Sequence, residues 1–323
     1  FDEKTGIFHL KNAYTSYVLQ LVRNKYLLHR YWGRPLREFR DSTPFQAIDR
    51  AFSPQPAAWS NERTFSLDVL PQEYPSYGHG DYRLPAYAVR LSNGTTVTEL
   101  AYSSYEIKAG KPALRGLPAA YAGENEAETL IITLTDTKGV LTVKLSYTIF
   151  ADQPVIARSV HIINTGSQSA DLLSAASFAI DFADHDFDRL SLYGGHAAER
   201  SLERVSLMHG IQETASRRGA SSHQQSPFLA LARKDATESK GDVYGFSLVW
   251  SGEFSFRTEV EQFGTTRVIG GINPAEFCWH LKAGESFQTP EALLVYSSDG
   301  LNGMSQAFHH IVREHIVRGR HQH

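Results

Sequence analysis

Four aspartates surround His185 in the stretch DFADHDFD, residues 181–188. Carboxylate and imidazole groups this close together could bind a calcium ion or a transition metal. The stretch lacks the turn glycine and the terminal glutamate of a calcium-binding EF-hand loop. We therefore predict a loop whose carboxylates are solvated or paired with basic side chains, and no metal site. The aspartates are Asp181, Asp184, Asp186 and Asp188.

Other patterns that mark catalytic or cofactor sites are missing from the sequence. His309, His310 and His315 lie close together, but no two of them have the i, i+4 spacing of a zinc-binding helix. The chain has no Gly-x-Ser-x-Gly nucleophile elbow, and no helical pattern follows the glycines of YGHGDY, residues 77–82. We expect neither a metal ion nor an organic cofactor.

Hydrolysis of a glycosidic bond needs only two carboxyl groups, and these can come from distant strands. The chain has 35 acidic residues, so their spacing does not identify such a pair. From pattern alone, a glycosidase site is neither predicted nor excluded.

The polar stretch RRGASSHQQSPF begins at Arg217. Arg217 and Arg218 carry permanently charged guanidinium groups that donate several hydrogen bonds each. Ser222, His223 and Gln224 add polar groups that can bond to backbone atoms across a contact. These side chains fit an interdomain contact, a sugar contact or a well hydrogen-bonded surface loop, with the interdomain contact preferred over the sugar.

The composition excludes some classes of partner. The chain has 323 residues and a formal net charge of -3, with basic and acidic residues interspersed along its length. A nucleic-acid-binding protein usually gathers a basic excess on one face, so no nucleic-acid partner is expected. The longest apolar runs are only a few residues, far too short to span a bilayer, so no membrane partner is expected.

The only cysteine, Cys278, cannot form an intrachain disulfide. It lies in the apolar stretch AEFCWHL, which predicts a small buried side chain. A lone cysteine fits a reducing compartment, and the N-terminal stretch shows no secretory pattern, so a cytoplasmic location is expected.

Alternating apolar and polar residues indicate strands with one buried face along most of the chain. The turn signals SNGT, residues 92–95, and DTKG, residues 136–139, predict hairpins, with Gly94 at positive φ in the first. This pattern predicts an all-β protein, and its length favours a large two-sheet assembly. The predicted strands are residues 14–21, 86–92, 129–136, 140–150, 155–163, 244–251 and 292–298.

One helix is predicted at the C-terminal end. Apolar residues from Asn302 onward recur at helical spacing, and Arg318 and Gly319 stand where such a helix should end. We predict a β-domain over residues 1–299 and a helix within residues 300–323. The apolar stripe consists of Met304, Phe308, Ile311, Val312 and Ile316.

The segment from Phe39 to Tyr77 differs from the rest because it is rich in proline, serine and charge and has no sustained period. A loop this long within a compact β domain is usually functional or interfacial.

Several long strings together resemble the N-terminal portion of the microbial α-galactosidases of glycoside hydrolase family 36. They include VLPQEYPSYGHGDYRLPAY (69–87), TLIITLTD (129–136), SRRGASSHQQSPF (216–228) and QFGTTRVIGGINP (262–274). The resemblance implies a β-supersandwich like that of galactose mutarotase, followed by a helical linker and a catalytic (β/α)₈ barrel. It also implies retaining hydrolysis of terminal α-galactosides such as melibiose and raffinose, a homotetramer, and no metal or organic cofactor.

The sequence departs from the family pattern in one decisive respect. The family's nucleophilic aspartate lies in a Lys-Trp-Asp-x-Asn stretch of the barrel, and no Lys-Trp-Asp occurs here. By resemblance, both catalytic carboxylates belong to the missing barrel, so this chain alone is expected to be inactive.

The resemblance also nominates residues of the long segment. In the related tetramers, part of the N-terminal domain approaches the active site of a neighbouring subunit. The stretches IDRAFSP (48–54) and NERTFSLD (61–68) match that region. This implies a role in substrate binding for Asp49, Phe52, Trp59 and Arg63, although Trp59 lies in a differing stretch, PAAWS, and could equally be a packing anchor.

An alternative function follows from the same fold resemblance. Aldose mutarotases use a histidine and a glutamate on one concave face, so a stand-alone sugar-binding or mutarotase-like protein remains open. A pair such as His161 and Glu261 would have to converge for this function.

Overall fold

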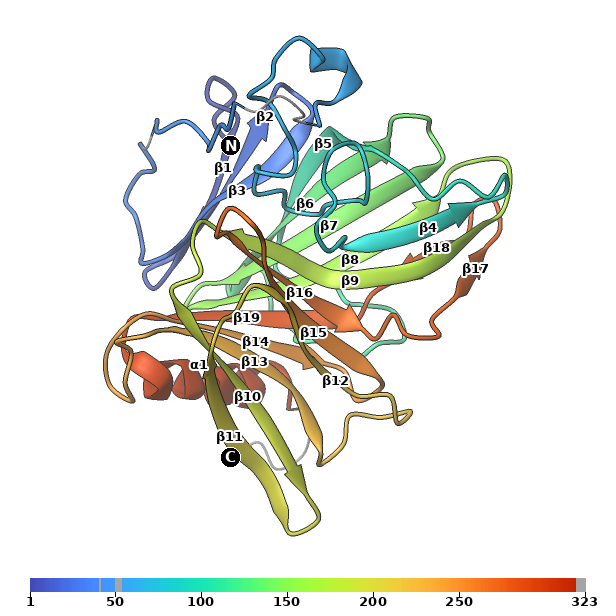
Figure 1. Ribbon diagram of the computed structural model, residues 1–323. Helices are drawn as coiled ribbons and strands as arrows, with labels where there is room; N and C mark the ends of the chain where they lie inside the picture. The colour runs from blue at the N-terminus through green and yellow to red at the C-terminus, as the bar shows by residue number, and fades with distance from the viewer. Residues whose placement is uncertain (41, 50–53, 318–323) are drawn as a thin grey trace.

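The computed structural model describes residues 1–40, 42–49 and 54–317 and consists mainly of antiparallel strands (Figure 1). These strands form two large sheets and one small one, which confirms the predicted all-β class and the two-sheet assembly. The small sheet has the order β1-β2-β3. Its strands are β1 (Ile7–Lys11), β2 (Ser16–Val22) and β3 (Tyr26–Gly33).

The largest sheet has ten strands in the order β11-β10-β13-β14-β19-β8-β7-β6-β5, with β18 also beside β8. Its middle strands show the period of two expected from the sequence, since Leu130, Ile132 and Leu134 are buried and alternate with more exposed residues. Its strands are β5 (Leu100–Ala109), β6 (Ala127–Asp136), β7 (Leu141–Phe150), β8 (Val155–Asn164), β10 (Phe187–Gly195), β11 (Ala198–Ser206), β13 (Gln225–Arg233), β14 (Val243–Val249), β18 (Ser286–Gln288) and β19 (Glu291–Ser297).

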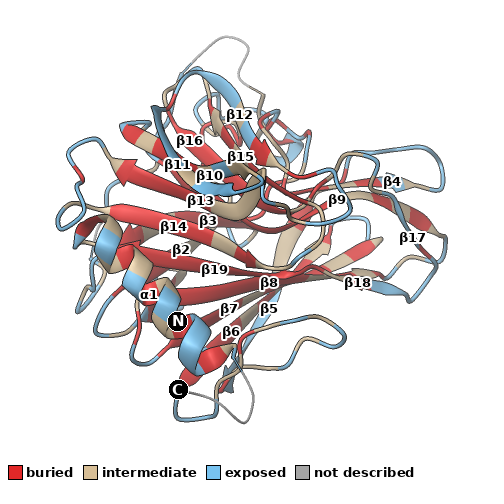
Figure 2. Ribbon diagram, turned by 90° about the horizontal axis from the view of Figure 1, so that it is seen from below, coloured by how far each residue is buried: buried red, intermediate tan, exposed pale blue. Residues whose placement is uncertain are grey.

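The second large sheet has six strands in the order β12-β15-β16-β9-β17, with β4 also beside β9. The core lies between the sheets, where buried residues form continuous bands (Figure 2). Phe178 of β9 stacks on Phe246 of β14 with ring centroids 5.2 Å apart and so joins the two large sheets. The strands are β4 (Tyr87–Leu91), β9 (Ala170–Phe182), β12 (Gly210–Ala215), β15 (Phe254–Val260), β16 (Thr266–Ile272) and β17 (Trp279–Leu281).

The predicted strands all occur, but one predicted hairpin is wrong. DTKG joins β6 to β7 with Gly139 at φ +73°, as expected. SNGT also forms a turn with Gly94 at φ +84°, but β4 pairs with β9 rather than with the strand that follows. The local sequence thus predicts the turn, whereas packing between distant segments decides the strand partner.

Helix α1 spans Gly300–His315, and the proposed stop at Arg318 and Gly319 lies outside the described residues. It packs against β14 and β19. Gly245 of β14 permits this approach, because a Cβ there would lie 2.7 Å from the side chains of Met304 and Phe308.

The buried carboxylate of Glu73 is the centre of the first of two ion clusters within the sandwich. Oε1 of Glu73 accepts hydrogen bonds from Arg158, at 2.6 Å, and from Tyr17 and Tyr147. Burial acts to raise the pKa of Glu73, but the charge of Arg158 and the hydrogen bonds outweigh it, and the pKa is lowered. Glu73 therefore ties the end of the long segment to β2, β7 and β8.

The second ion cluster joins Asp81 and Arg83 to β9 and β16. Arg267 donates to Asp81 and to both oxygens of Asp181, at 2.7–2.9 Å, and Arg83 contacts both aspartates. Arg83 also donates to the carbonyls of Leu67 and Leu70. Burial acts to raise the pKa of Asp81, but Arg267 and Arg83 outweigh it and lower the pKa to about 2.

Cys278 is exposed, and the prediction of a buried cysteine is wrong. Phe277 and Trp279, on either side of it, both pack against Phe287. Because successive side chains of an extended segment point to opposite faces, Cys278 is directed outward.

No helix in the described part of the chain has the length and apolarity needed to cross a membrane.

Replacing Asp81 with asparagine should weaken the second ion cluster. At pH 7 we expect Asp81→Asn to lower the free energy of unfolding by about 3 kcal/mol, because two buried guanidinium groups lose a charged partner. The stability contributed by ionised Asp81 is complete above its unfolded-state pKa of about 4 and is lost as the pH falls toward 2. Urea unfolding at several pH values should therefore show a shallower acid dependence for Asp81→Asn. The exposed Asp152→Asn should retain the full dependence, and equal slopes for all three proteins would contradict this role.

Candidate functional site

The long segment between β3 and β4 brings together two of the residues nominated for substrate binding. Nη2 of Arg63 lies 2.9 Å from Oδ1 of Asp49. The Arg63 side chain is 59% exposed and the Asp49 side chain is 63% exposed. Paired carboxylate and guanidinium groups can bind adjacent sugar hydroxyls through charge-assisted hydrogen bonds. Phe52, nominated with them, lies outside the described residues.

Trp59 packs within its own chain. It ends the short 3₁₀ helix η1 (Ala57–Trp59), and its ring lies 5.3 Å from that of Phe65 and 5.8 Å from that of Tyr26. The guanidinium of Arg23 lies 5.1 Å from the Trp59 ring and forms an ion pair with Glu62. The structure thus gives Trp59 the packing contacts of an anchor that fastens the segment to β3.

The charges around this anchor are themselves paired. Lys25 lies 2.7 Å from Oε1 of Glu99, which also accepts a hydrogen bond from the hydroxyl of Tyr26. Burial, together with this bond to Glu99, raises the pKa of Tyr26, so its hydroxyl stays a donor at neutral pH. Sequence patterns missed Arg23, Glu62 and Phe65, because their role depends on contacts between β2, β3 and the long segment.

The loop between β12 and β13 presents Arg217, Arg218 and His223 to solvent. Its backbone is fixed on one side, because the amide of Gly219 donates to Glu253. The hydroxyl of Ser222 donates to Oε1 of Gln224, and the carbonyl of Gln224 accepts from Gly194. The two arginines are thus displayed on a well hydrogen-bonded loop, an arrangement that suits a contact with another polar surface.

The aspartates of this stretch are paired with basic side chains, as predicted, but the prediction of a loop is wrong for Asp181, which lies on β9, and for Asp188, which lies on β10. Asp184, Asp186 and Asp188 form ion pairs with Arg233, Lys234 and Arg204, respectively. Burial acts to raise the pKa of Asp184, but hydrogen bonds from Arg233 and the backbone outweigh it, and the pKa is lowered. The described residues hold no cluster of histidine, cysteine, aspartate and glutamate suited to a metal ion.

The two residues considered for a mutarotase-like site come from different sheets. His161 lies on β8 in the ten-stranded sheet, whereas Glu261 follows β15 in the six-stranded sheet. Oε1 of Glu261 accepts from the amides of Phe263 and Thr265 and from the Thr265 hydroxyl, and so it stabilises its own turn. Within the described residues, no hydrogen bond or ion pair joins His161 to Glu261.

Comparison with known proteins shows which family the chain resembles. Residues 25–282 match the model of the glycosyl hydrolase family 36 N-terminal domain, and residues 286–323 match the melibiase model. The chain belongs to glycoside hydrolase family 36. Among curated family members, it is 51% identical to α-galactosidase AgaA of Geobacillus stearothermophilus over 99% of the chain. It is 46% identical to α-galactosidase 1 of Pediococcus pentosaceus over 98% of the chain.

Solved structures of family 36 members share the fold over the whole chain. The crystal structure of α-galactosidase AgaB from G. stearothermophilus covers all of this chain at 50% identity with a TM-score of 0.95. A doubly substituted form of AgaA in complex with raffinose covers 98% of it at 51% identity, with a TM-score of 0.94. The family 36 domain described here spans 43–44% of the length of these proteins.

The contacts of Trp59 make its contribution to stability measurable. Trp59→Ala removes an aromatic side chain packed against Tyr26 and Phe65, so we expect a loss of about 1–3 kcal/mol in the free energy of unfolding. Trp279→Ala is the control: Trp279 is 49% exposed and packs on one aromatic ring, that of Phe287, so its cost should be smaller. Chemical denaturation followed by circular dichroism measures both, and an equal cost would count against an anchoring role.

Proposed function

We propose that this chain is the non-catalytic N-terminal domain of an α-galactosidase that hydrolyses terminal α-galactosides, such as melibiose and raffinose, with retention of configuration. The observation that carries the proposal is the 51% identity to an α-galactosidase over 99% of the chain. The complex of its AgaA relative with raffinose supports a galacto-oligosaccharide as the substrate class. No metal or organic cofactor is required for this reaction, since two carboxyl groups about 5 Å apart suffice.

The catalytic carboxylates are proposed to lie in a (β/α)₈ barrel that follows α1 in the complete protein. Two observations support this division: the family 36 relatives are more than twice as long as this chain, and the Lys-Trp-Asp pattern is absent from it. Residues 1–299 then form the supersandwich and residues 300–323 lead toward the barrel. The exposed Arg217, Arg218 and His223, with Ser222 and Gln224, provide a polar contact for the barrel.

We further propose that Asp49 and Arg63, with Phe52 and Trp59 nearby in sequence, form part of the rim of a substrate pocket in a neighbouring subunit of a homotetramer. Figure 1 shows η1 at one end of the molecule and α1 in the opposite half. A barrel that follows α1 begins far from this segment, which supports contact with another subunit's pocket rather than its own.

The lone cysteine supports a cytoplasmic location.

The isolated chain and the complete protein should differ in activity. We expect the complete protein to release p-nitrophenol from p-nitrophenyl α-galactoside, and purified residues 1–323 to release none above the uncatalysed rate. A fragment whose folding is confirmed by circular dichroism and which nevertheless hydrolyses the substrate would overturn the proposed division of roles.

Asp49 and Arg63 should affect substrate binding in the complete protein. We expect Asp49→Asn and Arg63→Gln each to raise KM for melibiose about tenfold or to lower kcat/KM by that factor, because each removes a charge-assisted contact. Arg40→Gln changes an exposed, ion-paired arginine of the same segment and serves as the control. Light scattering would establish that the oligomer is intact. Unchanged kinetics for both variants in an intact oligomer would exclude the rim contact.

A further inference from the structure

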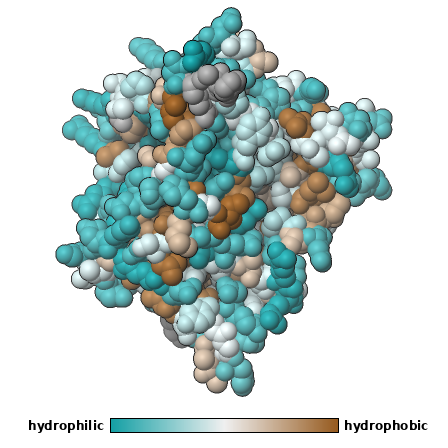
Figure 3. Space-filling model, viewed as in Figure 1, coloured by the Kyte–Doolittle hydropathy of each residue, from teal (hydrophilic) through white to brown (hydrophobic). Residues whose placement is uncertain are grey.

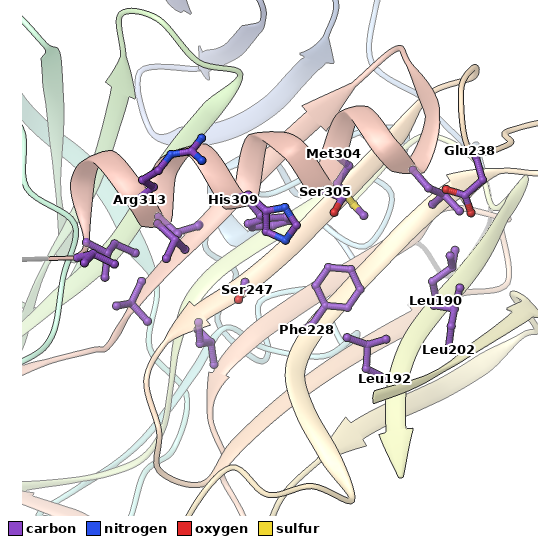
Figure 4. Close-up of a pocket in the computed structure, with 18 residues that line it drawn as sticks. Leu190, Leu192, Leu202, Phe228, Glu238, Ser247, Met304, Ser305, His309 and Arg313 are labelled. Atoms are coloured by element: carbon purple, nitrogen blue, oxygen red, sulfur yellow. The ribbon is translucent and has the colours of Figure 1, made fainter. Parts of the chain in front are cut away.

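A large apolar groove lies between α1 and the edge of the ten-stranded sheet. Its volume is about 860 Å³, and its walls come from α1 and from β10, β11, β13 and β14. Figure 4 shows Leu190, Leu192 and Leu202 of the hairpin formed by β10 and β11 across the groove from the helix, with Phe228 between them. The ring of Phe228 lies 6.0 Å from that of Phe308 and forms part of the floor.

The groove exists because α1 covers only part of the sheet. Met304, Ala307 and Ile311 are buried, but Val312, which the sequence places on the same apolar stripe, is 41% exposed. The helix contacts β14 and β19, whereas the sheet continues past β13 to β10 and β11. This leaves an apolar surface of the helix and an apolar surface of the hairpin facing each other without filling the space between them.

The hairpin presents its apolar residues on one face. Leu192 and Leu202 are directly paired across β10 and β11, so their side chains point to the same side of the sheet. Leu202 is 54% exposed, and nearly all of β11 is exposed as the edge of the sheet. In contrast, the face shown in Figure 3 is mostly hydrophilic, with apolar residues in small separate patches.

The chemistry of the lining favours a polypeptide as the occupant over a sugar. The polar residues Glu238, Ser247, Ser305, His309 and Arg313 are a minority of the groove's lining (Figure 4). Sugar sites need several convergent polar groups to replace the water bound to hydroxyls, and a mainly apolar groove of this size supplies few. Contiguous apolar surfaces on folded proteins usually mark protein contacts.

The residues that follow α1 indicate which polypeptide fits. Ile316 and Val317, the last described residues, both line the groove, and Val317 is 44% exposed. A domain attached directly after them is held at an effective concentration in the millimolar range, which a separate copy of the chain does not reach at ordinary concentrations.

We propose that this groove is the docking surface for the polypeptide that follows residue 323, which inserts apolar side chains between α1 and the hairpin of β10 and β11. The inference rests on the proposed function, because that function places a further domain after α1. It assigns the apolar part of the interdomain contact to Leu192, Leu202, Phe308 and Val312, separately from the polar loop at Arg217.

Hydrogen exchange of the complete protein tests this assignment. We expect Leu202→Asp and Val312→Asp each to accelerate amide exchange about tenfold in the hairpin, residues 187–206, and in α1, because a carboxylate in an apolar contact weakens docking. Val205→Asp is the matched control: Val205 is 36% exposed on the same strand, but its side chain points to the opposite face from Leu202. It should leave exchange unchanged. Leu202→Ser and Val312→Ala, which add no charge, should show the same pattern with smaller changes, and circular dichroism would confirm folding.

The remaining outcomes separate the possible occupants. The proposal would be overturned if Leu202→Asp and Val312→Asp both exchanged at the same rates as the control Val205→Asp. Loss of protection that accompanies dissociation of the oligomer, measured by light scattering, would assign the groove to a second copy and would also overturn it. Hydrolysis is assayed separately, so a complete protein that protects the groove but cleaves no α-galactoside rejects the proposed function alone. An intact mass that ends at residue 323 would reject both.

Discussion

The position of the long segment between β3 and β4 depends on two buried ion clusters. Glu73 is fully enclosed and is held by Arg158, and Asp81 and Arg83 are held by Arg267 and Asp181. Buried charges are tolerated only when they are closely paired, so each cluster strongly disfavours any other placement of the segment. The segment therefore has fixed ends although the only helix in its described residues is the short η1, and the Asp49–Arg63 pair lies between β3 and these two anchors.

The strands of the sandwich carry the charged partners of these two ion clusters. Arg158, Asp181 and Arg267 lie on β8, β9 and β16, so they come from both large sheets. The apolar core between the sheets fixes the strands, and the strands fix the charged partners that the segment must meet. Close packing of this kind resists local change, so the charged partners of the segment keep fixed positions.

The two ends of the molecule have different chemistry. Around η1 the exposed groups are charged and paired, as in Arg63 with Asp49 and Arg23 with Glu62. Around α1 the exposed groups include Leu202, Val312 and Val317, which are apolar. Charged pairs suit reversible contact with a hydroxylated ligand, whereas an apolar groove suits a permanent contact with protein. This division supports the proposed roles, in which a catalytic partner is joined at one end and substrate binds at the other.

The sequence by itself determined seven of the strands, the glycine turns and the family, because these depend on local periodicity and on strings of adjacent residues. The alternation in β6 to β8, the glycine turn at Gly139 and the helical stripe near the C-terminus all belong to this class. Tertiary structure alone decided that β4 pairs with β9, that Cys278 faces solvent and that Trp59 packs on Tyr26. It also decided that Asp181 meets Arg267, 86 positions away, and that α1 leaves a groove beside Leu202. Such contacts join residues far apart in the chain, and their energy depends on burial and on the choice of partner, neither of which a local pattern of residue types contains.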